Sequence, residues 1–208
     1  MEFDKDLTAR QEARELARRA ETAQRKLAEL SQSQLDAIVE AVAKAFAAQA
    51  SALAEMAVQE TGFGNAEDKR AKNLFASQRV AEAVRGMKTV GILREVPEKK
   101  LWEIGVPVGV IAAIIPSTNP TSTVCYKAMI ALKSGNAIVF SPHPKAIACT
   151  RKAAQIVSEA AQGAGAPADA VACLSIPSLD GCQELMKAEP VRLILATGGP
   201  GMVKADYS

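Results

Sequence analysis

A short polar stretch, Pro116-Ser117-Thr118-Asn119-Pro120, follows an unbroken apolar run from Val108 to Ile115. An asparagine amide held at such a junction could donate a hydrogen bond to an oxygen that gains negative charge during a reaction. Asn119 could equally cap a helix that starts at Pro120, because proline is favoured at the first helical position. The spacing alone favours the cap, and both roles stay open.

A glycine-rich turn, Thr197-Gly198-Gly199-Pro200-Gly201, follows another apolar run, Val191 to Ala196. Glycine lacks the Cβ that would hold a phosphate away from the backbone N–H groups, and a helix starting at Met202 would add its partial positive charge. The turn matches neither the Gly-x-Gly-x-x-Gly pattern nor the Walker loop. It therefore predicts either a phosphate site or a tight structural turn.

The single histidine lies in Ser141-Pro142-His143-Pro144, directly after the apolar run Ala137 to Phe140. Two prolines fix its direction, so His143 could contact a ligand or move a proton, or it could be incidental to a rigid loop. The four cysteines form no Cys-x-x-Cys pair, which argues against a zinc site. Cys125 has no basic neighbour to activate it, so we assign its thiol to packing.

These stretches require a particular set of elements to position them. Continuous apolar runs are typical of parallel strands covered on both faces, and a helix between two such strands makes a βαβ unit. The pattern predicts an α/β fold with a doubly wound parallel sheet, in which the polar loops lie at the carboxyl edge. Its expected helices are 120–133, 146–163 and 180–188, and its expected strands are 108–115, 137–140, 171–175 and 191–196.

Helices and a β-hairpin are expected before this sheet. Residues 6–30 predict a charged surface helix with Leu7, Ala13, Leu16, Ala17 and Ala20 near one face. Ser33 is the expected N-cap of a second helix whose apolar stripe continues to Met56, and Gly62 and Gly64 end it. A third helix spans 65–85. Two extended segments between Met87 and Val108, around a turn at 97–100, predict an antiparallel hairpin.

Composition restricts the class of protein. The chain has 208 residues, of which 49% are hydrophobic, so it can form a buried core. Its formal charge is only +2 and no basic stripe alternates with aromatic residues, so we expect no nucleic-acid partner. The sequence shows no membrane span and no signal peptide, which predicts a cytoplasmic protein without a membrane partner. The last expected helix is too short to cover its sheet face, so we expect a larger protein.

Taken together, several motifs resemble the aldehyde dehydrogenase superfamily, and within it the coenzyme A-acylating branch. They occur in order along the chain as Glu-Thr-Gly at 60–62, Glu-Asp-Lys at 67–69, Pro-Val-Gly-Val at 107–110, Pro-Ser-Thr-Asn-Pro-Thr-Ser-Thr at 116–123, Asn-Ala-Ile-Val-Phe-Ser-Pro-His-Pro at 136–144 and Leu-Ala-Thr-Gly-Gly-Pro-Gly-Met-Val at 195–203. Such a set is highly specific.

The resemblance implies NAD-dependent oxidation of a small aldehyde through a cysteine thioester, with release of the acyl group to coenzyme A (CoA). It implies that Asn119 is the catalytic oxyanion-hole amide. The implied cofactor-binding residues are Pro116, Ser117 and Thr118, the segment beside the adenine ribose formed by Ser141, Pro142, His143 and Pro144, and the turn facing the pyrophosphate formed by Thr197, Gly198 and Gly199. Ser141 and Pro144 stand where many hydrolytic members carry lysine and glutamate, so those ribose contacts are not transferred.

The resemblance also implies an organisation into an N-terminal helical segment (1–86), a hairpin that is a candidate oligomerisation element (87–107) and an incomplete NAD-binding sheet (108–208). We expect a homo-oligomer and no metal. None of the four cysteines matches the motif of the family's nucleophile, which we expect beyond residue 208, so the chain alone should be inactive. The alternatives are a non-catalytic assembly module and a hydrolytic aldehyde dehydrogenase.

Overall fold

The computed structural model of this protein describes residues 4–198, which contain eight α-helices and six strands. The helices are α1 (Lys5–Leu27), α2 (Gln32–Ala48), α3 (Ala50–Thr61), α4 (Ala66–Leu74), α5 (Val80–Val84), α6 (Pro120–Lys133), α7 (Ile147–Gly163) and α8 (Leu179–Lys187). The strands are β1 (Gly91–Val96), β2 (Leu101–Gly105), β3 (Val110–Ile115), β4 (Ala137–Pro142), β5 (Val171–Cys173) and β6 (Val191–Leu195). A π-helical segment, Phe75–Arg79, joins α4 to α5.

Four strands form a parallel sheet in the order β5-β4-β3-β6. Every residue of β3 and β4 is buried, which confirms that their continuous apolar runs are central parallel strands. The chain passes from β3 through β4 to β5 and then returns to place β6 on the other side of β3. The direction of winding therefore changes between β3 and β6.

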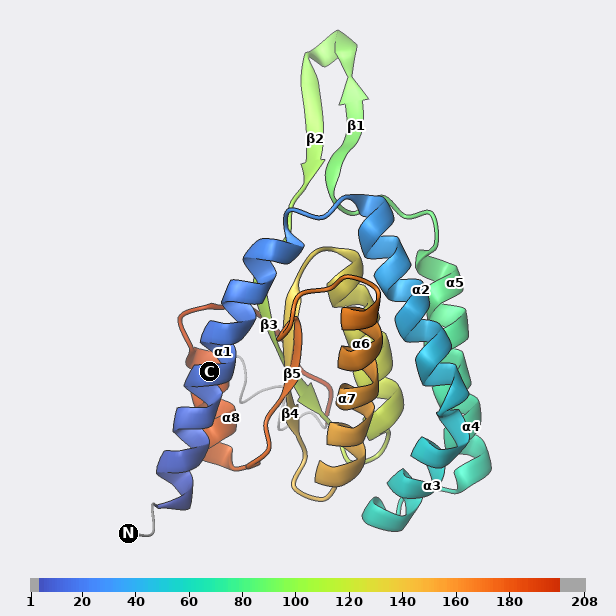
Figure 1. The fold of residues 1–208 in the computed structure, drawn as a ribbon, viewed down its shortest axis with the longest axis vertical. Helices are drawn as coiled ribbons and strands as arrows, with labels where there is room; N and C mark the ends of the chain where they lie inside the picture. The colour runs from blue at the N-terminus through green and yellow to red at the C-terminus, as the bar shows by residue number, and fades with distance from the viewer. Residues whose placement is uncertain (1–3, 199–208) are drawn as a thin grey trace.

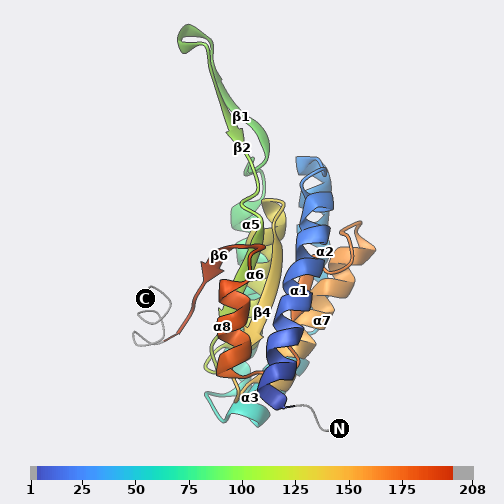
Figure 2. The ribbon, with the colours of Figure 1, turned by 90° about the vertical axis from the view of Figure 1, so that its left-hand side faces the viewer.

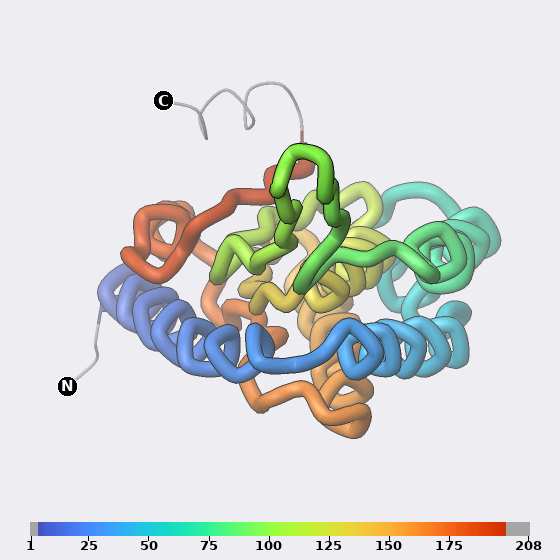
Figure 3. The backbone as a smooth tube through the Cα atoms, turned by 90° about the horizontal axis from the view of Figure 1, so that it is seen from above, coloured from blue at the N-terminus to red at the C-terminus, as the bar shows by residue number. Residues whose placement is uncertain are grey.

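Helices cover both faces of the sheet, as the doubly wound prediction requires. α1 and α8 pack together on one face, and α6 and α7 pack on the other (Figures 1 and 2). α2 lies outside α6 and α7, and in the view from above α1 and α8 lie on the opposite side of the molecule from α3, α4 and α5 (Figure 3). One hydrophobic core contains residues of α1, α2 and the sheet.

α1 packs on the sheet through a stripe of small side chains. Its buried residues are Ala9, Ala13, Ala17, Ala20, Ala23 and Leu27. Alanine lets the helix axis approach the strands closely, and the charged residues lie on the other side of the helix. Leu7, which the sequence placed near the apolar face, is 63% exposed because it lies two residues before Ala9 and therefore on the opposite side of the helix from the buried stripe.

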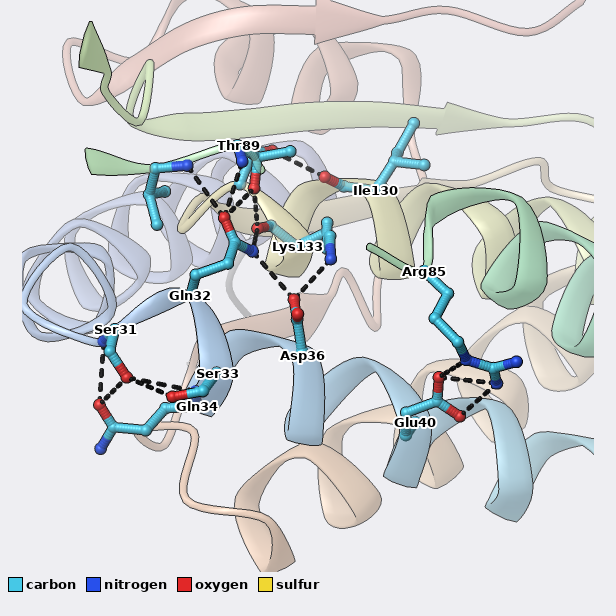
Figure 4. A network of polar contacts seen from close by, with 12 residues as sticks. Ser31, Gln32, Ser33, Gln34, Asp36, Glu40, Arg85, Thr89, Ile130 and Lys133 are labelled. Carbon is cyan, nitrogen blue, oxygen red and sulfur yellow. Dashed lines mark hydrogen bonds and ion pairs between the residues drawn. The ribbon is translucent and has the colours of Figure 1, made fainter. Parts of the chain in front are cut away.

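The second helix begins two residues earlier than predicted. Ser31, not Ser33, is the N-cap of α2: its Oγ accepts from the Gln34 backbone N–H, and the Gln34 Oε1 accepts from the Ser31 N–H at 2.9 Å (Figure 4). This reciprocal capping box needs a glutamine three residues after the serine, which only Ser31 has.

The apolar stripe predicted as one helix to Met56 is divided between α2 and α3, which bend by 64°. Within residues 4–198, no single helix has the length and apolar character to cross a membrane. Only α2 and α3 counted together, across this bend, reach that length and apolar character.

The hairpin of β1 and β2 projects from the body (Figure 1), as the sequence predicted. A polar network lies at its base (Figure 4). The Gln32 Oε1 accepts hydrogen bonds from the Thr89 and Val90 backbone N–H groups, and the Thr89 Oγ1 donates to the Lys133 carbonyl oxygen. These contacts tie the start of the hairpin to α2 and to the end of α6. Gly105 is required here because a Cβ would overlap the Thr89 carbonyl.

Glu60 at the end of α3 caps a different helix, α7. Its carboxylate accepts hydrogen bonds from the Ala148 and Cys149 backbone N–H groups, each at 2.7 Å. Partial burial favours the neutral carboxyl, but the bonds from Cys149 and Ala148 outweigh it and hold the pKa of Glu60 below its ordinary value. Glu60 therefore joins α3 to α7 through charge and hydrogen bonding at a helix N-terminus.

We expect Glu60→Gln to lower the free energy of unfolding by roughly 1 kcal/mol at neutral pH, as loss of a good N-cap does. Because the folded-state pKa is lowered, the contribution of Glu60 is present above its unfolded-state pKa of about 4.3 and is lost as the pH falls through the folded-state value. Urea unfolding at neutral and acidic pH measures this difference. Glu55→Gln, at an exposed position of α3, is the control. A variant difference that persists unchanged in acid would contradict the capping role.

Candidate functional site

Most of the predicted site residues line a crevice of about 330 Å³ at the carboxyl edge of the sheet. Its lining comes from the loop after β3, the first turn of α6, the loop after β4 and the residues after β6, namely Pro116, Ser117, Thr118, Asn119, Thr123, His143, Thr197 and Gly198. The crevice lies between β3 and β6, where the winding direction changes. Ligands of open α/β sheets bind at this kind of position.

The other predicted residues line a second, smaller cavity of about 160 Å³. Ser141, Pro142 and Pro144 face it together with the segment 177–179 and Cys182, and His143 contributes to both cavities. The structure thus brings together the loops that the sequence identified separately. Gly199 lies outside the described residues, and so does the helix expected from residue 202.

Ser141 and Pro142 are not loop residues, contrary to the prediction. β4 extends to Pro142, and the pairs Ile114–Ser141 and Ile115–Pro142 continue the register of β3 and β4. Ser141 is buried. A polar residue and a proline usually end a strand, but here both stay paired with β3. Of the four predicted residues, only His143 and Pro144 lie in the loop before α7.

Asn119 occupies the N-cap position of α6 but does not cap the helix with its side chain. Its backbone carbonyl accepts from the Thr123 backbone N–H at 3.2 Å and from the Thr123 Oγ1 at 2.6 Å. Its side-chain Oδ1 instead accepts from the Lys72 Nζ at 3.1 Å. The side-chain cap favoured by the spacing is therefore wrong, because a lysine from α4 holds the amide.

Lys69, also on α4, fixes the backbone of the same loop. Its Nζ donates to the Thr118 carbonyl oxygen at 2.6 Å, and the side chain is buried. Burial, and then the nearby charge of Lys72, lower the pKa of Lys69. Sequence reasoning identified Lys69 only as part of a motif and did not find Lys72. The available signal was their spacing of three residues, which places both on one helix face.

Lys127 on α6 is a second residue that sequence reasoning did not find. The residue is only 2% exposed, and its Nζ donates to the carbonyl oxygens of Ile114 at 2.9 Å and Leu195 at 2.5 Å. Burial lowers the pKa of Lys127 to about 8. Because Ile114 is in β3 and Leu195 is in β6, the lysine connects the two strands between which the crevice opens.

His143 is held by its own loop. Its Nδ1 accepts a hydrogen bond from the Lys145 backbone N–H at 3.0 Å. In the neutral ring the proton is then on Nε2. The geometry therefore makes neutral His143 a donor at Nε2, beside both cavities.

The sequence model of the aldehyde dehydrogenase family matches residues 5–205. The chain belongs to the aldehyde dehydrogenase family. This confirms the resemblance inferred from the motifs, and acylating enzymes among the relatives agree with the branch that the motifs indicated. The bifunctional aldehyde-alcohol dehydrogenase AdhE of Escherichia coli is 48% identical over 193 residues, which are 93% of this chain and 22% of AdhE. The acetylating succinate-semialdehyde dehydrogenase of Clostridium kluyveri is 39% identical over 94% of this chain and 43% of its own length.

Solved structures of aldehyde dehydrogenases have the same fold. A probable aldehyde dehydrogenase from Listeria monocytogenes superposes with a TM-score of 0.97 at 51% identity, over 99% of this chain and 45% of that one. An acetylating aldehyde dehydrogenase from Geobacillus thermoglucosidasius gives 0.96 at 53% identity, over 98% and 45%. The chain thus spans less than half the length of these aldehyde dehydrogenases.

Three thiols of this aldehyde dehydrogenase chain are protonated at neutral pH. Burial raises the pKa of Cys125, and burial raises the pKa of Cys173 to about 12. Burial, followed by Glu60, raises the pKa of Cys149 to about 12. Cys125 is in the core, as predicted. In the described part of the chain, no three His, Cys, Asp or Glu side chains are grouped to hold a metal ion.

Proposed function

We propose that this chain is the cofactor-binding part of a CoA-acylating aldehyde dehydrogenase. The reaction converts an aldehyde, CoA and NAD to an acyl-CoA, NADH and a proton. The supporting observation is the crevice at the switch point between β3 and β6, lined by Asn119, His143 and Thr197, in a chain whose relatives include acetylating enzymes.

The residues of the two cavities fit a nicotinamide dinucleotide. Thr197 and Gly198, which begin the turn that continues to Gly199 in the sequence, would face the pyrophosphate, and Pro116, Ser117 and Thr118 also line the crevice. Ser141, Pro142, His143 and Pro144 would lie beside the adenine ribose, where the smaller cavity offers a hydroxyl among apolar walls. When bound, the cofactor accepts a hydride from the substrate. An engineered glycolyl-CoA reductase with bound NADP+ is 31% identical to this chain, with a TM-score of 0.81, which supports the assignment.

Asn119 is the oxyanion donor of the proposed reaction. Its Oδ1 is bonded to Lys72, and its Nδ2 makes no hydrogen bond to the other described residues. An N–H donor fixed beside the aldehyde carbonyl stabilises the negative charge that develops on the carbonyl oxygen when a nucleophile attacks.

The nucleophile is a cysteine, which we place in sequence outside these 208 residues. A propionaldehyde dehydrogenase of Rhodopseudomonas palustris, 29% identical with a TM-score of 0.80, has been solved with bound CoA and an acylated cysteine. Three of the four cysteines here have pKa values too high for a thiolate at neutral pH. Cys182 faces the smaller cavity and not the crevice beside Asn119.

The test uses protein expressed from the complete coding sequence. With a small aldehyde, NAD and CoA, acyl-CoA and NADH should form in equal amounts, as measured by chromatography and absorbance. Formation of the free carboxylic acid in place of acyl-CoA would reject the acylating assignment and favour the hydrolytic branch. We also propose a cytoplasmic location, because the spacing of the cysteines in the sequence does not suggest a disulfide framework, as expected in a reducing compartment.

We propose that the hairpin of residues 87–107 binds a second copy of the chain. Trp102 is 64% exposed, and Ile104 and Val106 are also exposed. A two-stranded hairpin is marginally stable alone in water, and its unpaired edges can add strands from another molecule. Apolar side chains on such a projecting element favour a homo-oligomer.

The charge-introducing variant Trp102→Glu should shift the protein to a smaller oligomer, because a carboxylate cannot be buried without a partner. Light scattering after size-exclusion chromatography measures the mass. Leu7→Glu, at an apolar residue of α1 with 63% exposure, is the matched control and should keep the wild-type mass. An unchanged mass for the Trp102 variant would reject the hairpin as an oligomerisation element.

A further inference from the structure

Two lysines of α4 point at one loop of the crevice. Lys69 and Lys72 are three residues apart, and each donates to a different residue of the loop after β3. Lys69 binds the backbone of Thr118 and is buried, whereas Lys72 binds the side chain of Asn119 and is exposed. The two lysines therefore do different things: one fixes the path of the loop, and the other contacts only the side-chain amide.

The contact from Lys72 decides which way the amide of Asn119 faces. A side-chain amide has an oxygen that only accepts and a nitrogen that donates, and half a turn about its last bond exchanges them. An ammonium can only donate, so the oxygen must face Lys72. The nitrogen is then directed away from Lys72. Since Asn119 lines the crevice, the group left for a ligand is a donor and not an acceptor.

The positive charge of Lys72 also makes the Nδ2–H groups of Asn119 stronger hydrogen-bond donors. Hydrogen bonds in a chain polarise one another, and a charged donor at the amide oxygen draws electron density from the amide nitrogen. The Nδ2–H groups consequently become better donors to an oxygen that gains negative charge.

We propose that Lys72 is a positioning residue for Asn119, and that it holds and polarises the amide so that Nδ2 faces the carbonyl oxygen of the aldehyde. This inference rests on the proposed function, in which Asn119 is the oxyanion donor. Lys72 itself touches neither substrate nor cofactor, and it acts only through the amide.

The test compares Lys72→Met and Lys72→Arg in the wild-type protein and in the Asn119→Ala background, with protein from the complete coding sequence. Lys72→Met should lower kcat by about 10-fold, the effect of losing one hydrogen bond of ordinary strength. The KM for the aldehyde and the Kd for NAD should stay unchanged, because only the transition-state charge depends on the amide. Lys72→Arg keeps a charged donor and should restore most of the rate.

In the Asn119→Ala background, Lys72→Met should have no further effect, because the amide through which it acts is gone. Arg70→Met is the control on the same helix, since Arg70 donates to Ser51 away from the crevice. Circular dichroism during heating checks that each variant is folded.

The possible results separate this inference from the proposed function. A normal kcat for Lys72→Met together with a low kcat for Asn119→Ala would overturn the positioning role and leave the oxyanion role intact. An equal loss from Lys72→Met in both backgrounds would also overturn it, because Lys72 would then act independently of the amide. A normal kcat for Asn119→Ala would overturn both.

Discussion

Asn119→Ala is expected to lower kcat for aldehyde oxidation by about 100- to 1000-fold, the usual effect of removing one oxyanion-hole donor. The structure leaves the amide nitrogen for this role, because Lys72 holds the oxygen and the side chain does not cap α6. The helix should survive the substitution, since its first turn is bonded to the Asn119 backbone carbonyl. Steady-state kinetics of the protein from the complete coding sequence measures the effect.

Asn119→Asp is the matched variant for this prediction. It has nearly the same shape as asparagine but replaces the donor with an acceptor, so it should be as slow as the alanine variant. Calorimetry should give both variants a Kd for NAD close to that of wild type, because the loss affects the transition state. A near-normal kcat in either variant would restrict Asn119 to its backbone role at the start of α6.

Phe140→Ala is expected to lower the free energy of unfolding by about 3–5 kcal/mol, the cost of removing a large aromatic side chain from a packed core. Phe140 is 0% exposed and lies in the centre of β4, opposite Ala113 of β3 and Cys173 of β5. Small neighbours at this level cannot fill the space that the ring leaves. Such a loss is a large fraction of the total stability of a typical domain.

Phe75→Ala is the matched control, because Phe75 is 64% exposed in the π-helical segment and its removal leaves no cavity. Denaturant unfolding of both variants, at equal protein concentration, gives the comparison. If the two phenylalanine variants had the same stability, Phe140 would not be a core residue and the arrangement of β4 would be wrong. Ser141 and Pro142 continue β4 and line the smaller cavity, so the Phe140 variant should also weaken the binding of NAD there.

The central strands were predictable because burial on both faces of a sheet requires a continuous apolar stretch in the sequence. β3 and β4 are covered on both faces, so all of β3 and the part of β4 from Ala137 to Phe140 are apolar, and the helix between them requires a parallel connection. The same reasoning placed the loops of Asn119 and Thr197 at one edge of the sheet. A crevice lined by both loops confirms that placement, because β6 is next to β3.

The polar partners at the crevice could not be predicted, because they depend on how distant elements dock. Lys72 is 47 residues from Asn119, and Lys127 is 68 residues from Leu195. No local spacing relates these pairs. Asn119 was favoured as a side-chain cap because spacing reports only its own helix, whereas the amide is bonded to α4. Lys127 is a charged residue in a largely apolar stretch of sequence. Its burial is explained only by the carbonyl groups of Ile114 and Leu195, which the adjacent ends of β3 and β6 supply.

The most direct test of the acylating assignment is the time course of NADH formation when protein from the complete coding sequence is mixed with aldehyde and NAD alone. We predict a burst of roughly one NADH per subunit that then stops, because the acyl group stays on the enzyme until a thiol removes it. Addition of CoA should restart turnover and release acyl-CoA. Continuous NADH formation without CoA, with the free acid as product, would contradict the proposed function.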